Sequence, residues 1–266
     1  MISGEIIILA NFKFNAIAIA FFALSSTTYA ADYVYQTSQD PWANKTNDSA
    51  MSAVFGAANW SKSGYNIADF SGAKFVFLDG SDNNANELSS FIGGNQSFLE
   101  NYVAGGGHLF INSAPNEGGT FSLGFGVTLN YDFAHQSTHS SVAIINTAGV
   151  SAGLTYGDIA TEYTGNFFSH ATVTGPLTSL IDGSAGSIFS VMEWGSGFVA
   201  FGGQTTTNFH DPVVDARGLL ANELAYVASV PFVSPLPIPE PEIYAMLLAG
   251  LGLLGFVARR RKESVI

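Results

Sequence analysis

The chain has 266 residues, of which 47% are apolar and only 11% are charged, and its formal net charge is −12. Because an ordinary domain is about 25% charged, this composition predicts a folded domain with a neutral polar surface, which is typical of secreted and surface proteins. Residues 32–239 contain 17 acidic and four basic residues, and such a surface repels and excludes nucleic acid as a partner. The chain has no cysteine, which excludes disulfides, thiolate metal sites and cysteine nucleophiles.

Residues 1–31 predict an export signal peptide. An apolar stretch at residues 16–24 precedes small and polar residues, and Thr28-Tyr29-Ala30 fits a small-x-Ala cleavage site. The beginning departs from the usual pattern, because it carries Glu5 and has Lys13 as its one basic residue. An uncleaved N-terminal anchor is the alternative, and either form directs the following residues outward.

Residues 32–229 predict one exported α/β domain. A short strand over residues 32–36 opens it, followed by a helix over 49–58 and a loop over 59–64 that contains Trp60. The apolar run at residues 73–78 is typical of a buried parallel strand and ends at Asp79.

The next segment predicts a strand–helix–strand crossover. Residues 83–94 are polar and indicate a loop, with a helical turn over residues 87–92 as the alternative. Asn95 can cap a helix that extends to Val103, and glycines at 105–107 end it. His108–Asn112 is the next buried strand. This order favours a Rossmann-like, mostly parallel sheet flanked by helices.

The second half of the domain predicts strands and one late helix. Short alternating apolar runs at residues 121–174 indicate strands and loops, and residues 187–194 and 198–201 indicate two strands around the turn Gly195-Ser196-Gly197. Asp211 and Pro212 are suited to begin a helix whose apolar face holds Val213, Leu220, Leu224 and Val227. Prolines then predict a stiff linker over residues 230–238.

The C-terminal end combines three features. Pro239-Glu240-Pro241 precedes the uncharged apolar stretch 243–258, and the basic cluster Arg259-Arg260-Arg261-Lys262 follows it. A transmembrane helix over 243–258 would rise about 24 Å, a little less than the ~30 Å hydrocarbon core, and flanking side chains can extend it. Because basic residues stay cytoplasmic, the domain is expected on the outer side of the inner membrane. A buried core helix with a charged end is the alternative.

These features together resemble the PEP-CTERM sorting signal of Gram-negative bacteria, over residues 239–262. The resemblance implies that exosortase, a membrane protease, recognises Pro239, Glu240 and Pro241 and processes the protein near them. It also implies export, transient anchoring in the inner membrane, and association with an extracellular polysaccharide or biofilm matrix.

Residues 75–112, with the loop at Gly202-Gly203 and the helix after it, resemble the glutamine-amidotransferase-like α/β domains, including the trehalose-utilisation-type ones. The stretch at residues 169–177 resembles their His-Pro-Val-Thr-x-Gly-Leu segment. Active members carry a cysteine after a strand like His108–Asn112, and this chain has Ser113 there. The amidotransferase activity is therefore not implied.

Four residues are the candidates for a site: Asp79, Asp82, Ser113 and His170. Ser113 follows a buried strand, yet no Gly-x-Ser-x-Gly elbow surrounds it, so a loop serine bonded to the backbone is the stronger interpretation.

Three other patterns have a functional and a structural interpretation. The oxygen-rich loop that begins at Asp79 suits either calcium or turn capping. His135 and His139 suit zinc on a helix, but their neighbours indicate a loop and a solvated pair. Trp42, Trp60 and Trp194 suit sugar stacking or packing.

The favoured function is an exported surface or matrix protein with a non-catalytic α/β domain, with exosortase, the inner membrane and possible polysaccharide as partners and no cofactor. The alternative is a secreted hydrolase-like enzyme that uses Ser113 or the Asp79 loop with a histidine.

Overall fold

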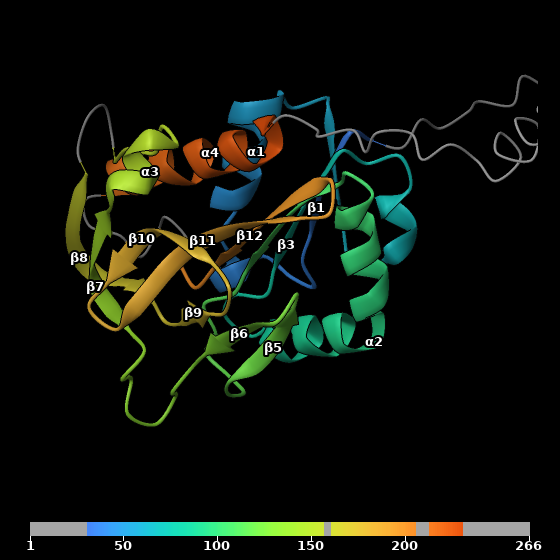
Figure 1. Ribbon diagram of the computed structural model, residues 1–266. Helices are drawn as coiled ribbons and strands as arrows, with labels where there is room; N and C mark the ends of the chain where they lie inside the picture. The colour runs from blue at the N-terminus through green and yellow to red at the C-terminus, as the bar shows by residue number, and fades with distance from the viewer. Residues whose placement is uncertain (1–30, 157–160, 206–212, 231–266) are drawn as a thin grey trace, which may run out of the picture.

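A nine-stranded mixed sheet lies at the centre of the computed structural model, which describes residues 31–156, 161–205 and 213–230 (Figure 1). The strand order is β2-β1-β3-β4-β12-β11-β10-β7-β8. These strands are β1 (Tyr33–Gln36), β2 (Trp60–Ser63), β3 (Phe75–Asp79), β4 (His108–Asn112), β7 (Ser140–Ile145), β8 (Glu162–Ser169), β10 (Thr178–Gly183), β11 (Gly186–Trp194) and β12 (Gly197–Gly202).

A second sheet has three strands in the order β5-β6-β9. Its strands are β5 (Phe121–Gly124), β6 (Val127–Asn130) and β9 (Thr172–Thr174). The α-helices are α1 (Thr46–Phe55), α2 (Ala85–Ala104), α3 (Thr147–Ser151) and α4 (Val213–Ser229), and two 3-10 turns, η1 (Pro41–Ala43) and η2 (Ile67–Phe70), precede α1 and β3.

The large sheet is parallel in one half and antiparallel in the other. β2, β1, β3, β4 and β12 run parallel, whereas β11, β10, β7 and β8 pair antiparallel. The expectation of a mostly parallel sheet therefore holds only for the first half. Parallel neighbours need long crossovers, and the short turns that join β10, β11 and β12 allow only hairpins.

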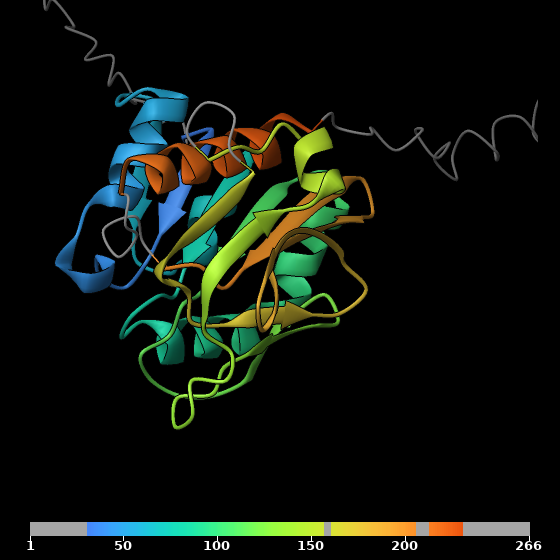
Figure 2. The same ribbon diagram turned by 90° about the vertical axis from the view of Figure 1, so that its left-hand side faces the viewer.

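Alternating side chains divide the core into two layers. On one face of the sheet, Tyr35, Phe77 and Phe110 pack with α1 and α4. On the other face, Val76 and Ile111 pack with α2 and the small sheet. Successive strand residues point to opposite faces, so each strand contributes to both layers. Figures 1 and 2 show the large sheet between these two sets of elements.

Helix α2 is longer than its sequence indicated. Residues 83–94 were expected to form a loop with no more than a helical turn over residues 87–92, but α2 already begins at Ala85 and includes that turn. Leu88 and Ile92 are buried against the sheet, and this packing outweighs the polar, glycine-containing local sequence. Asn95 has non-helical backbone angles and donates its side-chain N–H to the carbonyl of Phe91, so it marks a kink rather than the beginning of the helix.

The other boundaries follow the prediction with small shifts. The predicted strands at residues 108–112, 187–194 and 198–201 are confirmed as β4, β11 and β12. The first predicted helix is displaced toward the N-terminus, as α1. The loop expected at residues 59–64 is wrong, because Trp60 begins edge strand β2, which pairs in parallel with β1.

Several expectations lie outside the described residues. They are the export signal apart from Ala31, the caps at Asp211 and Pro212, the linker beyond Val230, the processing motif and the basic cluster. The predicted membrane span 243–258 also lies there. Among residues 31–156, 161–205 and 213–230, no helix has the length and apolar character needed to cross a membrane.

Gly197 offers a direct test of the packing between β12 and α2. A Cβ at this position would lie 2.1 Å from the carbonyl oxygen of Val103 and 2.3 Å from that of Gly107. We expect Gly197→Ala to lower the free energy of unfolding by about 2 kcal/mol or more, because backbone atoms must move. The matched control is Gly93→Ala on α2, where a Cβ meets no atom within 4 Å. It is expected to add about 0.5–1 kcal/mol of stability through helix propensity. Urea unfolding measures both, and equal losses would contradict the packing.

Candidate functional site

At the carboxyl ends of the parallel strands, the chain leaves neighbouring strands toward opposite faces of the sheet. From β1 the chain continues into α1 on one face, and from neighbouring β3 it continues into α2 on the other. In α/β sheets such a switch point is the usual place for a ligand crevice. Asp79 and Ser113 lie directly at this edge, as the strand pattern predicted.

Asp79 is fully buried and its carboxylate is surrounded by donors. Oδ1 accepts from the backbone N–H (3.2 Å) and Oγ (2.6 Å) of Ser81 and from Nδ2 of Asn112 (3.1 Å). Oδ2 accepts from Nδ2 of Asn47 at 2.6 Å. Burial raises the pKa of Asp79 to about 6, while hydrogen bonds from Ser81, Asn112 and Asn47 oppose the rise. The carboxylate thus joins α1, β3 and β4.

Asn112 carries this network to β12 and α4. Its Nδ2 donates to the carbonyl of Gln204 (3.0 Å) and its Oδ1 accepts from the backbone N–H of Gln204 (3.1 Å). Gly202 leaves room for the amide, because a Cβ there would lie 2.6 Å from Asn112 Oδ1. Nε2 of Gln204 then donates to Oε2 of Glu223 at 2.6 Å.

Glu223 is a buried carboxyl that the sequence analysis missed. Burial raises its pKa to about 8, and the hydrogen bond from Gln204 opposes the rise. Its Oε1 has no hydrogen-bond partner among the described residues. Helical spacing could have identified it, since Glu223 lies three residues after Leu220 and four before Val227, on the predicted apolar face.

Ser113 and Asp82 are held by hydrogen bonds to neighbouring loops. Ser113 is buried and donates its hydroxyl to the carbonyl of Gly80 at 2.7 Å. Asp82 accepts from the backbone N–H of Trp42 (3.0 Å) and from Nδ2 of Asn116 (2.8 Å). The two residues share the sheet edge, but Ser113 does not point to a histidine.

His170 lies in the same region and bonds elsewhere. Its Nδ1 donates to the carbonyl of Pro115 at 2.9 Å, and burial lowers its pKa. The backbone beside it approaches β12 closely: a Cβ on Gly203 would lie 2.1 Å from the carbonyl oxygen of Ala171. This close approach places the His170 ring at the edge of the sheet.

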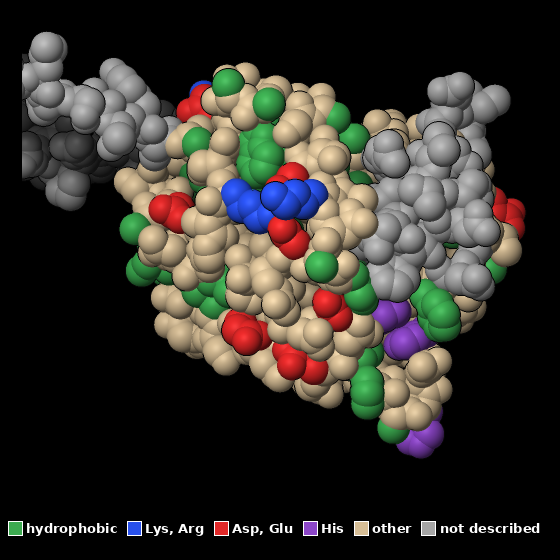
Figure 3. All heavy atoms as spheres, turned by 180° about the vertical axis from the view of Figure 1, so that it is seen from behind, with side chains coloured by type: hydrophobic (Ala, Val, Ile, Leu, Met, Phe, Trp, Pro, Cys, Tyr) green, Lys and Arg blue, Asp and Glu red, His purple; other side chains and the backbone are tan. Residues whose placement is uncertain are grey.

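Five rings, including that of His170, lie together at this edge of the sheet. We call them the aromatic–histidine cluster: Trp42, Tyr131, His139, Phe167 and His170. Tyr131, His139 and His170 form a near-parallel stack, with centroid distances of 6.2 and 4.4 Å. Trp42 and Phe167 stand perpendicular to His170, at 5.8 and 6.1 Å. Figure 3 shows histidine and apolar side chains next to each other on this face.

The side chains that the sequence offered as metal ligands lie in two loops. His135 and His139 lie in a loop, where the exposed His135 ring contacts Asp132 at 3.2 Å while His139 stacks on His170. Within the described ranges, no group of three or more histidine or acidic side chains has a geometry suited to a metal ion. In the loop after Asp79, Asn84 Oδ1 accepts from the Ser38 hydroxyl and from the backbone N–H of Gln39.

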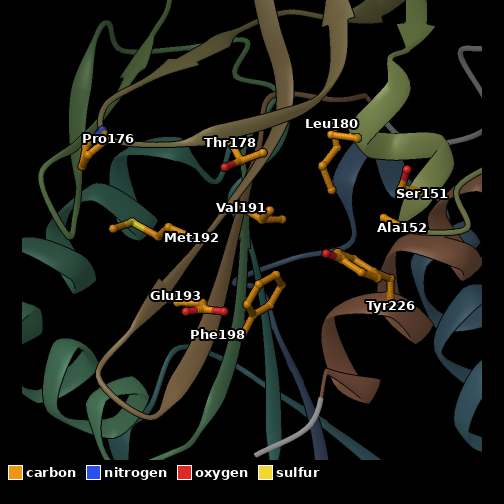
Figure 4. Close-up of a pocket in the computed structure, with 11 residues that line it drawn as sticks. Ser151, Ala152, Pro176, Thr178, Leu180, Val191, Met192, Glu193, Phe198 and Tyr226 are labelled. Atoms are coloured by element: carbon orange, nitrogen blue, oxygen red, sulfur yellow. The ribbon is translucent and has the colours of Figure 1, made fainter. Parts of the chain in front are cut away.

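A groove of about 640 Å³ opens elsewhere, between α3, the end of α4 and strands β10–β12 (Figure 4). Tyr226 reaches from α4 toward Phe198, and their rings meet edge to face at 5.7 Å. The groove lining contains none of the four predicted site residues.

Comparison with known proteins identifies one motif. Residues 237–262 match the family model of the PEP-CTERM protein-sorting motif, so the chain carries this sorting signal, as its sequence predicted. No curated protein matches the chain.

Three solved structures show distant likeness. A β-galactosidase from Bacillus circulans sp. alkalophilus is 12% identical, with a TM-score of 0.45 over 75% of this chain and 31% of the enzyme. A putative GMP synthase protein from Thermoplasma acidophilum is 10% identical, with a TM-score of 0.47 over 74% of this chain and 94% of the other. The exo-β-1,4-mannosidase Op5Man5 from Opitutaceae bacterium strain TAV5 is 11% identical, with a TM-score of 0.40 over 74% of this chain and 36% of the enzyme. The chain therefore spans less than a third of the β-galactosidase.

The raised pKa of Glu223 predicts how the stability of the protein changes with pH. Because its pKa is about 8 when folded and ordinarily 4.5, its protonation contributes stability that is complete below pH 4.5 and is lost as the pH rises through 8. Glu223→Gln mimics the neutral acid. We expect it to raise the melting temperature at pH 9 by at least about 5 °C and to change it little at pH 5. Thermal unfolding at both pH values measures this. The control Glu87→Gln, at an exposed helix start, should leave the pH profile unchanged. A wild-type profile flat from pH 5 to 9 would contradict the buried neutral acid.

Proposed function

We propose that this chain is an exported protein that exosortase processes at the membrane, leaving a non-catalytic α/β domain at the cell surface or in a polysaccharide-rich extracellular matrix. The observation that carries the proposal is the sorting motif at residues 237–262, which begins a few residues after the described domain. The motif supports export and membrane-anchored sorting. The acidic, sparsely charged composition suits an extracellular location.

The geometry of the strand ends supports a non-catalytic role. A serine nucleophile needs a base within hydrogen-bond reach. The Ser113 hydroxyl instead donates to Gly80, and the His170 ring donates to Pro115. The carboxylate of Asp79 is buried and already accepts four hydrogen bonds from neighbouring residues.

A secreted hydrolase-like enzyme is the second candidate. The observation that favours it is Asp79 itself, a buried carboxyl with a pKa of about 6 at the switch point of the sheet. Such perturbed groups gather at active sites, although buried structural networks perturb pKa values as well.

The sorting proposal is tested by changing Pro239, Glu240 and Pro241 to alanine in a chain tagged within the domain. We expect the triple variant to accumulate unprocessed in the membrane fraction, whereas the wild type appears as a shorter form outside it. The control changes Pro231 and Pro235, which precede the matched motif, and should be processed normally. Identical processing and location of the triple variant and the wild type would refute the role of the motif.

The catalytic alternative is tested with a fluorophosphonate probe, which labels activated serines covalently. We expect no labelling at Ser113, because its hydroxyl donates to a carbonyl and has no base to accept its proton. Mass spectrometry of the full chain measures the adduct, with Ser113→Ala as the blank. Labelling of the wild type that the Ser113→Ala variant loses would establish an activated serine and overturn the non-catalytic assignment.

A further inference from the structure

The aromatic–histidine cluster is assembled from segments far apart in the sequence. Trp42 belongs to η1, Tyr131 follows β6, His139 precedes β7, and Phe167 and His170 lie at the end of β8. Phe167 is 45% exposed, so the cluster presents an aromatic ring to solvent. The exposed part of this ring gains nothing from burial, and it forms an apolar surface beside the rings of His139 and His170.

Backbone strain is concentrated in the same segments. Six non-glycine residues among those described have positive φ, and four of them belong to the segments that carry the cluster: Trp42, Ala43, Gln136 and Phe167. Asp82 is a fifth, and it accepts a hydrogen bond from the backbone N–H of Trp42. For bulky side chains such as Trp42 (φ 51°) and Phe167 (φ 50°), this conformation is unfavourable. Strain of this kind gathers at ligand-binding sites, where it holds side chains in position.

The charges around the cluster disfavour an anionic ligand. Asp82 lies beside Trp42, and hydrogen bonds from Ser137 and His135 hold the pKa of Asp132 at about 2. Burial, together with the neighbouring His170, lowers the pKa of His139 to about 4, so this imidazole is neutral at pH 7. The surface therefore combines the exposed ring of Phe167 with carboxylate acceptors, and neutral, buried imidazoles lie beneath them.

We propose that the aromatic–histidine cluster is a binding site for a neutral saccharide. A pyranose ring has an apolar C–H face, which suits the exposed ring of Phe167, and hydroxyl groups at its rim, which suit carboxylate partners. This inference deepens the proposed function, because it names the site and the ligand class by which the exported domain contacts a matrix.

The test is a binding titration with the purified full chain in a polyoxyethylene detergent, which has no sugar headgroup. The probes are neutral gluco-, galacto- and manno-oligosaccharides, an oligouronate as the acidic counterpart, and Zn²⁺ alone. We expect at least one neutral oligosaccharide to bind in calorimetry, while the oligouronate and Zn²⁺ do not bind.

Variants then assign binding to the cluster. Phe167→Leu keeps an apolar side chain without a flat ring, and Phe167→Ala removes it; both are expected to weaken binding at least tenfold, while Phe167→Tyr retains it. The matched control is Phe98→Ala on α2, where a phenylalanine is 39% exposed outside the cluster, and it should bind as the wild type does.

Three outcomes would overturn the inference: no binding of any neutral oligosaccharide, equal loss in Phe98→Ala and Phe167→Leu, or binding of Zn²⁺ alone that His139→Ala abolishes. The outcome is separable from the sorting proposal. Phe167→Leu should be processed and located as the wild type is, whereas a triple alanine variant at residues 239–241 should bind saccharide normally.

Discussion

A buried hydrogen-bond network at the carboxyl ends of the parallel strands is the constraint on which the rest of the structure depends. The Asn112 amide joins Asp79 of β3 to Gln204 after β12, and Gln204 extends the connection to Glu223 on α4. In a low-dielectric interior such groups are costly unless they are paired, so the network admits only one arrangement of these elements. It holds α4 and the loops at this edge in register with the sheet.

The network also uses polar groups at the place where an α/β sheet usually binds its ligand. Asp79 and Ser113 occupy the positions where such folds carry catalytic groups, yet both bond to neighbouring loops. In the same region, the rings of Trp42 and His170 meet edge to face.

The division of the large sheet shows how local sequence selects topology. β3 and β4 are joined through the 20-residue helix α2 and lie parallel, whereas β11 and β12 are joined by a tight glycine turn and lie antiparallel. Residues 108–112 could be predicted as a buried strand, because five consecutive residues are buried on both faces. The first half of α2 could not, because the burial of Leu88 and Ile92 depends on a sheet that local pattern does not reveal.

The sequence by itself determined the C-terminal sorting motif, the acidic balance, the absence of cysteine and the strands of the α/β core, because each of these is written in residue type or short-range spacing. Only the tertiary structure decided the candidate site. Trp42, His139 and Phe167 are far apart in the sequence, and their rings each meet that of His170 only when the loops before α1 and β7 and the end of β8 come together. Glu223 illustrates the same limit: its helical position was visible, but its proton is retained because the folded sheet and helix exclude water.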